Sequence, residues 1–150
     1  MSFIKRFKIK YLDKKARFDE SAVLVLNDRL LKIMKEIDKY FKDDSSNNLH
    51  SMRLAFRRFR YVLEIFYECI PPKLFKRVYS IAEEMQDLIG TARDLDVMEQ
   101  KIQATAVELK QKAPMYLVKK IEKEKSAAKQ NIKLELIKFI SDKDINKLVI

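Results

Sequence analysis

Residues 50–70 read HSMRLAFRRFRYVLEIFYECI, and this stretch decides the fold. Its apolar side chains recur at spacings of three and four residues, which is the period of an amphipathic α-helix. The predicted core stripe consists of Met52, Ala55, Phe56, Phe59, Val62, Leu63, Phe66, Cys69 and Ile70. We therefore expect one long helix over about 49–70, with Ser46, Asn47 or Asn48 as its N-cap.

The flanking segments show the same helical period over about 19–42, 72–111 and 115–140. Clusters of helix-breaking residues at 43–48, 71–72 and 113–114 separate them. In the first of these segments the predicted core positions are Val23, Leu26, Leu30, Ile33, Met34, Ile37 and Phe41. Four amphipathic helices joined by short loops predict an all-α fold, an antiparallel four-helix bundle with long helices.

A chain of 150 residues is expected to form a single domain. Within residues 1–150 we expect a basic N-terminal arm at 1–15, the helical bundle at 16–140 and a short C-terminal tail at 141–150. Ser141-Asp142 begins that tail, which has room for one more helix. The first 17 residues carry a net charge of +6, and the sequence assigns them no role.

The rare residue types exclude several kinds of site. One cysteine cannot form an internal disulfide, and one histidine with one cysteine leaves only carboxylate metal sites open. A single glycine in the chain rules out glycine-rich phosphate loops. We therefore assign no metal ligand and no cofactor.

The longest uninterrupted apolar run, Ala22 to Leu26, is far shorter than the roughly 20 residues that span a bilayer. The basic N-terminus is not followed by the apolar segment of a signal peptide. Together with the single cysteine, these features predict a soluble cytoplasmic protein without membrane insertion.

The chain carries 32 Lys and Arg against 22 Asp and Glu, a net charge of +10, which favours polyanionic partners. In the helix over 49–70, the face opposite the core collects His50, Arg53, Arg57 and Arg60, with Arg58 on the flank. Guanidinium groups suit phosphate oxygens, and like charges at this spacing repel unless anions lie against them. The alternative is a solvated face whose arginines pair with carboxylates of a neighbouring helix.

Residues 88–97, LIGTARDLDV, contain the only glycine inside a predicted helix, where it costs about 1 kcal/mol relative to alanine. A close helix crossing or the close approach of a ligand would offset this cost, and we favour the crossing. Asp96 falls on the apolar face and therefore needs a cationic partner. We expect an arginine of the preceding helix, so that Asp96, with Asp94, orients arginines.

The helix over about 115–140 has a core stripe of Leu117, Ile121, Ala128, Ile132, Leu136 and Phe139. Lys119, Lys123 and Lys133 fall roughly opposite this stripe, whereas Lys125 and Lys129 point elsewhere. A solvated lysine face is the default interpretation. We include Lys119, Lys123 and Lys133 as candidate walls of an anion-binding groove.

Together, residues 50–60 (HSMRLAFRRFR) and 88–97 resemble the paired signature of the CHAD family, the conserved-histidine α-helical domain. The resemblance implies an all-helical domain that binds inorganic polyphosphate without hydrolysing it. The family's basic positions match His50, Arg53, Arg57, Arg58, Arg60 and Arg93, and its acidic pair matches Asp94 and Asp96. The full family domain is similar to two successive four-helix halves, whereas this chain has length for one. A homodimer would then complete the binding channel.

Two other functions remain to be weighed. The first is a basic helical protein that binds nucleic acid or the ribosome, although the chain has no tryptophan and no evident helix-turn-helix. The second is an enzyme, because residues 122–126 (EKEKS) imitate the start of a triphosphate-processing motif. That motif requires a strand and a further lysine, so we expect no catalysis.

Overall fold

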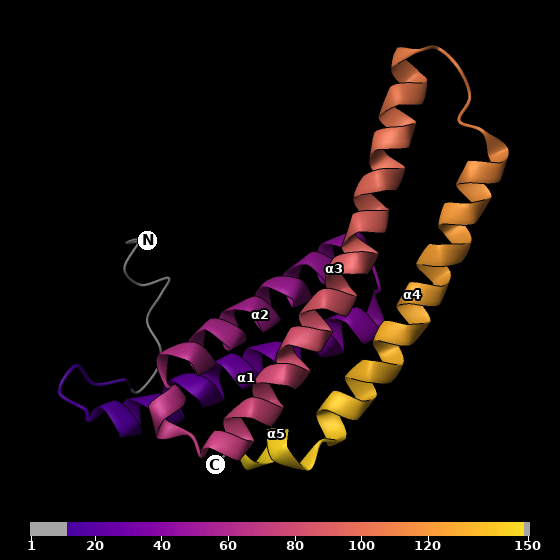
Figure 1. The fold of residues 1–150 in the computed structure, drawn as a ribbon. Coiled ribbons are helices and arrows are strands. Elements are labelled where there is room, and N and C mark those ends of the chain that lie inside the picture. The colour runs from indigo at the N-terminus through magenta and orange to yellow at the C-terminus, as the bar shows by residue number, and fades with distance from the viewer. Residues whose placement is uncertain (1–11, 149–150) are drawn as a thin grey trace.

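The computed structural model describes residues 12–148, and every regular element in this range is helical (Figure 1). The elements are α1 (Phe18–Lys42), α2 (Ser46–Ile65), the 3-10 turn η2 (Tyr67–Cys69), α3 (Pro72–Glu108), α4 (Met115–Ser141) and α5 (Lys143–Lys147). The all-α prediction is confirmed. Most of the predicted basic arm lies outside the described residues.

The four long helices form two hairpins, α1 with α2 and α3 with α4 (Figure 1). The first hairpin lies across one half of the second, and the other half of α3 and α4 extends beyond it. In the described part of the chain, no helix is long and apolar enough to cross a membrane.

The start of α2 is set by Ser45, whose extended backbone leaves its side chain free to accept a hydrogen bond from Asn48 N at 3.4 Å. The three predicted caps are therefore wrong by one residue or more. Asn48 instead fastens the loop, since its Nδ2 donates to the backbone oxygen of Asp43 at 2.8 Å and to Asp43 Oδ2 at 3.2 Å.

The end of α2 comes five residues earlier than predicted. Phe66 leaves helical geometry (φ −104°, ψ 20°), and η2 then leads into the two prolines that begin α3. Phe66 and Ile70 are nevertheless buried, so the apolar pattern continues after the helix has ended. The periodicity identified the buried face of this segment but not its backbone.

The core lies where the two hairpins overlap. Its largest fully buried side chains include Tyr40, Phe56, Phe59 and Phe139, and the rings of Phe56 and Phe139 meet edge to face at 5.1 Å. The predicted stripe of α2 is buried throughout, except that Cys69 is half-buried. In α1 two predicted core positions are wrong, because Val23 and Phe41 are exposed.

The C-terminal tail packs on the outside of this core as α5. Asp142 caps the helix by accepting hydrogen bonds from the backbone nitrogens of Asp144 at 2.8 Å and Ile145 at 3.2 Å. Arg77 of α3 binds Asp142 and Asp144 at 2.9 and 2.8 Å, and Ile145 is buried. The predicted additional helix in the tail is therefore present.

The Ser45 cap is testable by substitution. Ser45→Ala should lower the free energy of unfolding by about 1 kcal/mol, because the Asn48 N–H loses its acceptor. Asn47→Ala, at an exposed predicted cap, should change it by less than about 0.5 kcal/mol. Urea denaturation followed by circular dichroism measures both, and equal losses would contradict the assignment.

Candidate anion-binding site

The arginines of α2 do not share one surface. Arg58 is exposed on the side of α1, where it lines a pocket with Arg29, Lys32 and Glu36. Arg57 is exposed too, and its Nε donates to the Tyr61 hydroxyl at 2.9 Å. The position of Arg58 beside α1 agrees with its predicted place on the flank, outside the arginine face.

Arg60 is the arginine of α2 that is most engaged with its neighbours. Its Nη1 donates to Gln86 Oε1 at 3.2 Å, and its guanidinium lies 5.5 Å from the centre of the Tyr79 ring. Glu64 and Glu83 carboxylates lie 3.7 and 3.9 Å from its nitrogens. For Arg60 the structure therefore matches the alternative of an arginine paired with neighbouring carboxylates.

His50, Arg53 and Arg58 contrast with Arg60. Among the described residues, none of these three side chains makes a hydrogen bond or an ion pair. His50 and Arg58 are exposed, and Arg53 is half-buried beside α3. His50 and Arg53 are therefore polar or cationic groups on α2 without an ion pair among the described residues, whereas Arg58 shares its pocket with the Glu36 carboxylate.

Gly90 lies directly under Arg53. A Cβ built on this glycine would meet only Arg53 Nη2 at 3.8 Å and Nε at 3.9 Å, so no other helix backbone comes within 4 Å. The expected close helix crossing is therefore wrong. The glycine gives room to a guanidinium group rather than to a crossing helix.

Arg93 connects α3 to the first turn of α2. Its Nη1 donates to the Ser46 hydroxyl, and a second contact of 3.9 Å joins it to Asp96 of its own helix. The backbone N–H groups of that first turn carry partial positive charge. Arg93 therefore adds a full charge beside the positive end of α2.

Asp96 is buried, with 6% of its surface exposed, and its predicted partner is wrong. The cation nearest to it is Lys125 of α4, whose Nζ lies 3.0 Å from Oδ1, and not an arginine of α2. Lys125 also binds Glu99. Burial acts against the charge of Lys125, but the Glu99 and Asp96 carboxylates outweigh it and raise its pKa.

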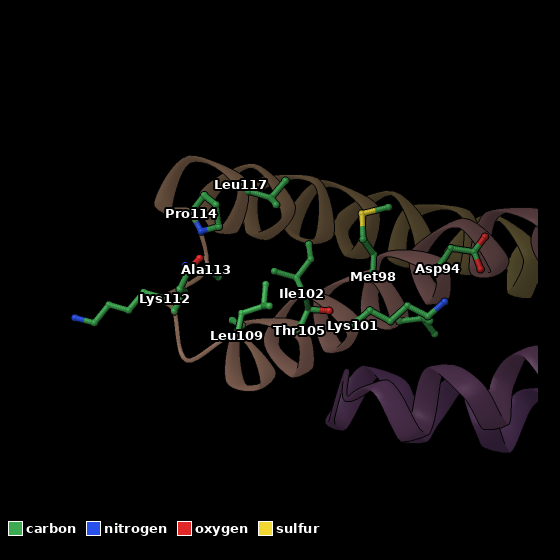
Figure 2. A pocket seen from close by; sticks show the side chains of 13 residues that line it. Asp94, Met98, Lys101, Ile102, Thr105, Leu109, Lys112, Ala113, Pro114 and Leu117 are labelled. Carbon is green, nitrogen blue, oxygen red and sulfur yellow. The ribbon is translucent and has the colours of Figure 1, made fainter.

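Asp94, the other predicted orienting carboxylate, is exposed and lines a groove between α3 and α4 (Figure 2). It forms no ion pair with an arginine among the residues that the structure describes. The groove has a volume of about 650 Å³, and Met98, Ile102 and Leu117 also line it. Asp94 thus belongs to the far half of the α3–α4 hairpin.

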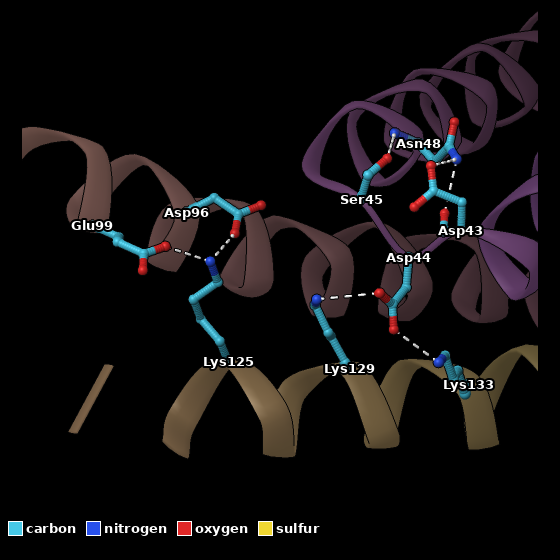
Figure 3. Close-up of polar contacts among 9 residues, drawn as sticks. All are labelled: Asp43, Asp44, Ser45, Asn48, Asp96, Glu99, Lys125, Lys129 and Lys133. Carbon is cyan, nitrogen blue, oxygen red and sulfur yellow. Dashed lines mark hydrogen bonds and ion pairs between the residues drawn. The ribbon is translucent and has the colours of Figure 1, made fainter. Parts of the chain in front are cut away.

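The lysines of α4 divide differently from the prediction. Lys119 and Lys123 are exposed and make no ion pair within the described residues, whereas Lys133 turns inward. Lys125, Lys129 and Lys133 recur every four residues and line the side of α4 that faces α3 and the α1–α2 loop (Figure 3). Sequence reasoning missed Lys125 and Lys129, although their one-turn spacing to Lys133 was a usable signal.

Asp44 of the α1–α2 loop lies between the last two of these lysines. Its Oδ2 is 2.9 Å from Lys133 Nζ, and its Oδ1 is 3.3 Å from Lys129 Nζ. The hydrogen bond from Lys133, with smaller contributions from Lys129, holds the pKa of Asp44 below its ordinary value. Burial raises the pKa of nearby Tyr40 to about 12, and the charges of Asp44 and Asp96 add to this effect.

These groups define a class of protein: a helical domain with a basic surface suited to anions. Within residues 12–148, no three His, Cys, Asp or Glu side chains are grouped so as to hold a metal ion. The donors of the site are guanidinium, ammonium and imidazole groups, which suit phosphate oxygens.

The chain belongs to the CHAD family, because the family model of the CHAD domain matches residues 6–138, most of its length. The CHAD domain is associated in general with polyphosphate binding and is in general a binding domain rather than a catalytic one. No curated protein and no solved structure matches the chain.

The space above Gly90 leads to a stability prediction. Gly90→Ala should raise the free energy of unfolding by about 1 kcal/mol, because the new Cβ finds ordinary contacts and alanine favours the helix. Ala104→Gly, at an exposed position of the same helix, should lower it by a similar amount. Urea denaturation compares the two variants, and a destabilised Gly90→Ala protein would show that the helices pack more closely here.

Proposed function

We propose that this protein binds inorganic polyphosphate through the α2 face and does not hydrolyse it. The observation that carries the proposal is that His50 and Arg53 of α2 have no ion pair among the described residues, with Arg53 above Gly90 at the centre of the face. Like charges along one helix gain no stability from one another. A bound polyanion places negative charges beside these side chains, which have none within the described fold.

Within this proposal the basic residues have different roles. His50, Arg53 and Arg57 bind successive phosphates, and Arg93 binds at the start of the helix. Arg60 joins only if phosphate replaces the carboxylates near it. Arg58 lies on the α1 side, where a chain that follows the α3 side does not reach it. Exposed Lys119 and Lys123 add long-range attraction.

The affinity of such a site comes from many contacts together. Charge-assisted hydrogen bonds to phosphate are stronger than neutral ones, and binding displaces counterions condensed on the polymer. Binding should therefore weaken steeply as salt concentration rises.

A titration with labelled long-chain polyphosphate tests the site. Arg53→Ala/Arg57→Ala should bind at least about tenfold more weakly, since each contact to a charged group contributes on the order of 1 kcal/mol or more. The magnitude of the slope of log affinity against log salt should fall by about 1.4 to 1.8, because two phosphate contacts are lost, as for other phosphate polymers. Lys73→Ala/Lys76→Ala removes the same charge from exposed positions at the other end of the fold and should change affinity little.

Three outcomes would contradict the proposal. Equal affinity of the wild type and the arginine variant would remove the site assignment. Displacement of polyphosphate by duplex DNA or RNA at equal charge concentration would favour the nucleic-acid alternative. Release of orthophosphate in the presence of divalent metal would show an enzyme.

We further propose that the four long helices form one antiparallel bundle whose extended α3–α4 hairpin pairs with a second copy. Its side chains Val107, Leu109, Met115 and Tyr116 are apolar or aromatic and between 62% and 78% exposed. Residues 97–118 carry three lysines and two glutamates, so two copies of a +10 chain repel least at this end.

Light scattering of the protein with and without polyphosphate tests the pairing. The mass should approach that of a dimer as protein concentration rises. Val107→Asp/Tyr116→Asp should remain a monomer, because buried carboxylates oppose the contact and both positions are exposed in one copy. A monomeric mass at all concentrations would contradict the pairing, and a ligand-driven increase that the variant retains would assign the association to polyphosphate alone.

A further inference from the structure

The ion pairs of Asp44 have the form of an occupied anion site. One carboxylate places one oxygen on each of two ammonium groups, Lys129 and Lys133, which stand one turn apart on α4 (Figure 3). The two non-bridging oxygens of a phosphate group present the same arrangement of acceptors. Asp44 itself supplies the anion in the free protein.

The loop holds this carboxylate in place from both sides. Asn48 binds Asp43, the residue before Asp44, and the side chain of Ser45, the residue after it, caps α2. The loop therefore presents Asp44 at a fixed position rather than on a loose end. Its side chain and those of both lysines are only about one-third exposed, yet solvent still reaches them.

The position also continues the α2 face. Ser46, two residues after Asp44, accepts the hydrogen bond from Arg93. A polymer that follows Arg53 and Arg93 to the start of α2 therefore meets the α1–α2 loop and, beyond it, Lys129 and Lys133. In Figure 3 these lysines rise from α4 toward that loop.

We propose that Lys129 and Lys133 form a second phosphate subsite, which the Asp44 carboxylate occupies in the free protein and a phosphate group of the polymer takes over. The inference rests on the proposed polyphosphate binding. A polymer anchored on α2 holds its next phosphates near the loop at high effective concentration, whereas free orthophosphate lacks that anchor. The subsite thus favours chains over single phosphates.

The neighbouring ion pair of Lys125 with Asp96 differs from this subsite in how deeply its carboxylate is buried. Partly exposed ion pairs contribute little to stability, so exchange of Asp44 for phosphate leaves the fold intact. Asp96 is buried, and loss of its partner Lys125 would leave a buried charge without compensation. Lys125 therefore stays with Asp96 and Glu99, and the subsite ends at Lys129.

The test compares two substitutions that remove the same charge from adjacent residues. Asp44→Asn should strengthen the binding of long-chain polyphosphate about fivefold, because both lysines lose a competing anion. Asp43→Asn removes a carboxylate that contacts Asn48 and neither lysine, so it should have a much smaller effect. In a Lys129→Ala/Lys133→Ala background, Asp44→Asn should lose its effect.

A second measurement needs no substitution. The carboxyl carbon of Asp44, followed by NMR over a pH titration, should report a depressed pKa in the free protein. Saturating long-chain polyphosphate should raise that pKa, since the carboxylate gives up its lysine partners and lies beside a polyanion. Orthophosphate at the same phosphate concentration should leave it unchanged.

The outcomes separate this inference from the proposed function. Wild-type binding with equal effects of Asp44→Asn and Asp43→Asn, or an Asp44 pKa that polyphosphate does not move, overturns the subsite and leaves the α2 face standing. A wild-type protein that fails to bind long-chain polyphosphate overturns both.

Discussion

Burial of Phe56 and Phe59 fixes the rotation of α2, and the position of every basic group on that helix depends on it. Both rings are fully buried, and Phe56 meets Phe139 of α4 edge to face. A helix with two large rings locked into a core cannot turn about its axis without opening that core. Arg53 and Arg57 therefore lie where the aromatic residues leave them, beside α3 and outward.

The two hairpins are joined by polar and ionic contacts at one end of their shared core. Arg93 of α3 donates to Ser46 at the start of α2, and Asp44 of the α1–α2 loop binds Lys129 and Lys133 of α4. The pair of Lys125 with the buried Asp96 joins α3 to α4 within one hairpin. Apolar packing alone would permit the hairpins to slide, whereas the contacts of Arg93 and Asp44 form in one register only. The buried Asp96 fixes α3 against α4, because loss of Lys125 would leave its charge without compensation. This polar end both aligns the hairpins and gathers the cations of the proposed site.

The sequence was sufficient to predict the four long helices and the buried face of α2, because the spacing of apolar residues along a helix is a local property. It placed the end of that helix at residue 70 because Phe66 and Ile70 stay buried after the backbone has changed. It could not name the partner of Asp96, since helical phase shows that a carboxylate is buried but not which helix covers it. The spacing of Lys129 to Lys133 was visible in the sequence, but their shared partner Asp44 was not, because it lies in a loop distant in sequence.

Two groups of ion pairs hold lysines of α4: Asp44 with Lys129 and Lys133, and Lys125 with Asp96 and Glu99. Changes of pH near neutrality do not break either group. The depressed pKa of Asp44 means that its pairs stabilise the fold above its ordinary pKa and are lost as pH falls through the folded value. The raised pKa of Lys125 means that its pairs persist below its ordinary pKa and are lost as pH rises through the folded value. Between about pH 5 and pH 9 both sets of pairs are therefore intact. Under these conditions a competing anion, and not a proton, releases Lys129 and Lys133 from Asp44. In the proposed subsite, the presence of ligand and not the pH therefore decides whether Asp44 or a phosphate group contacts the two lysines.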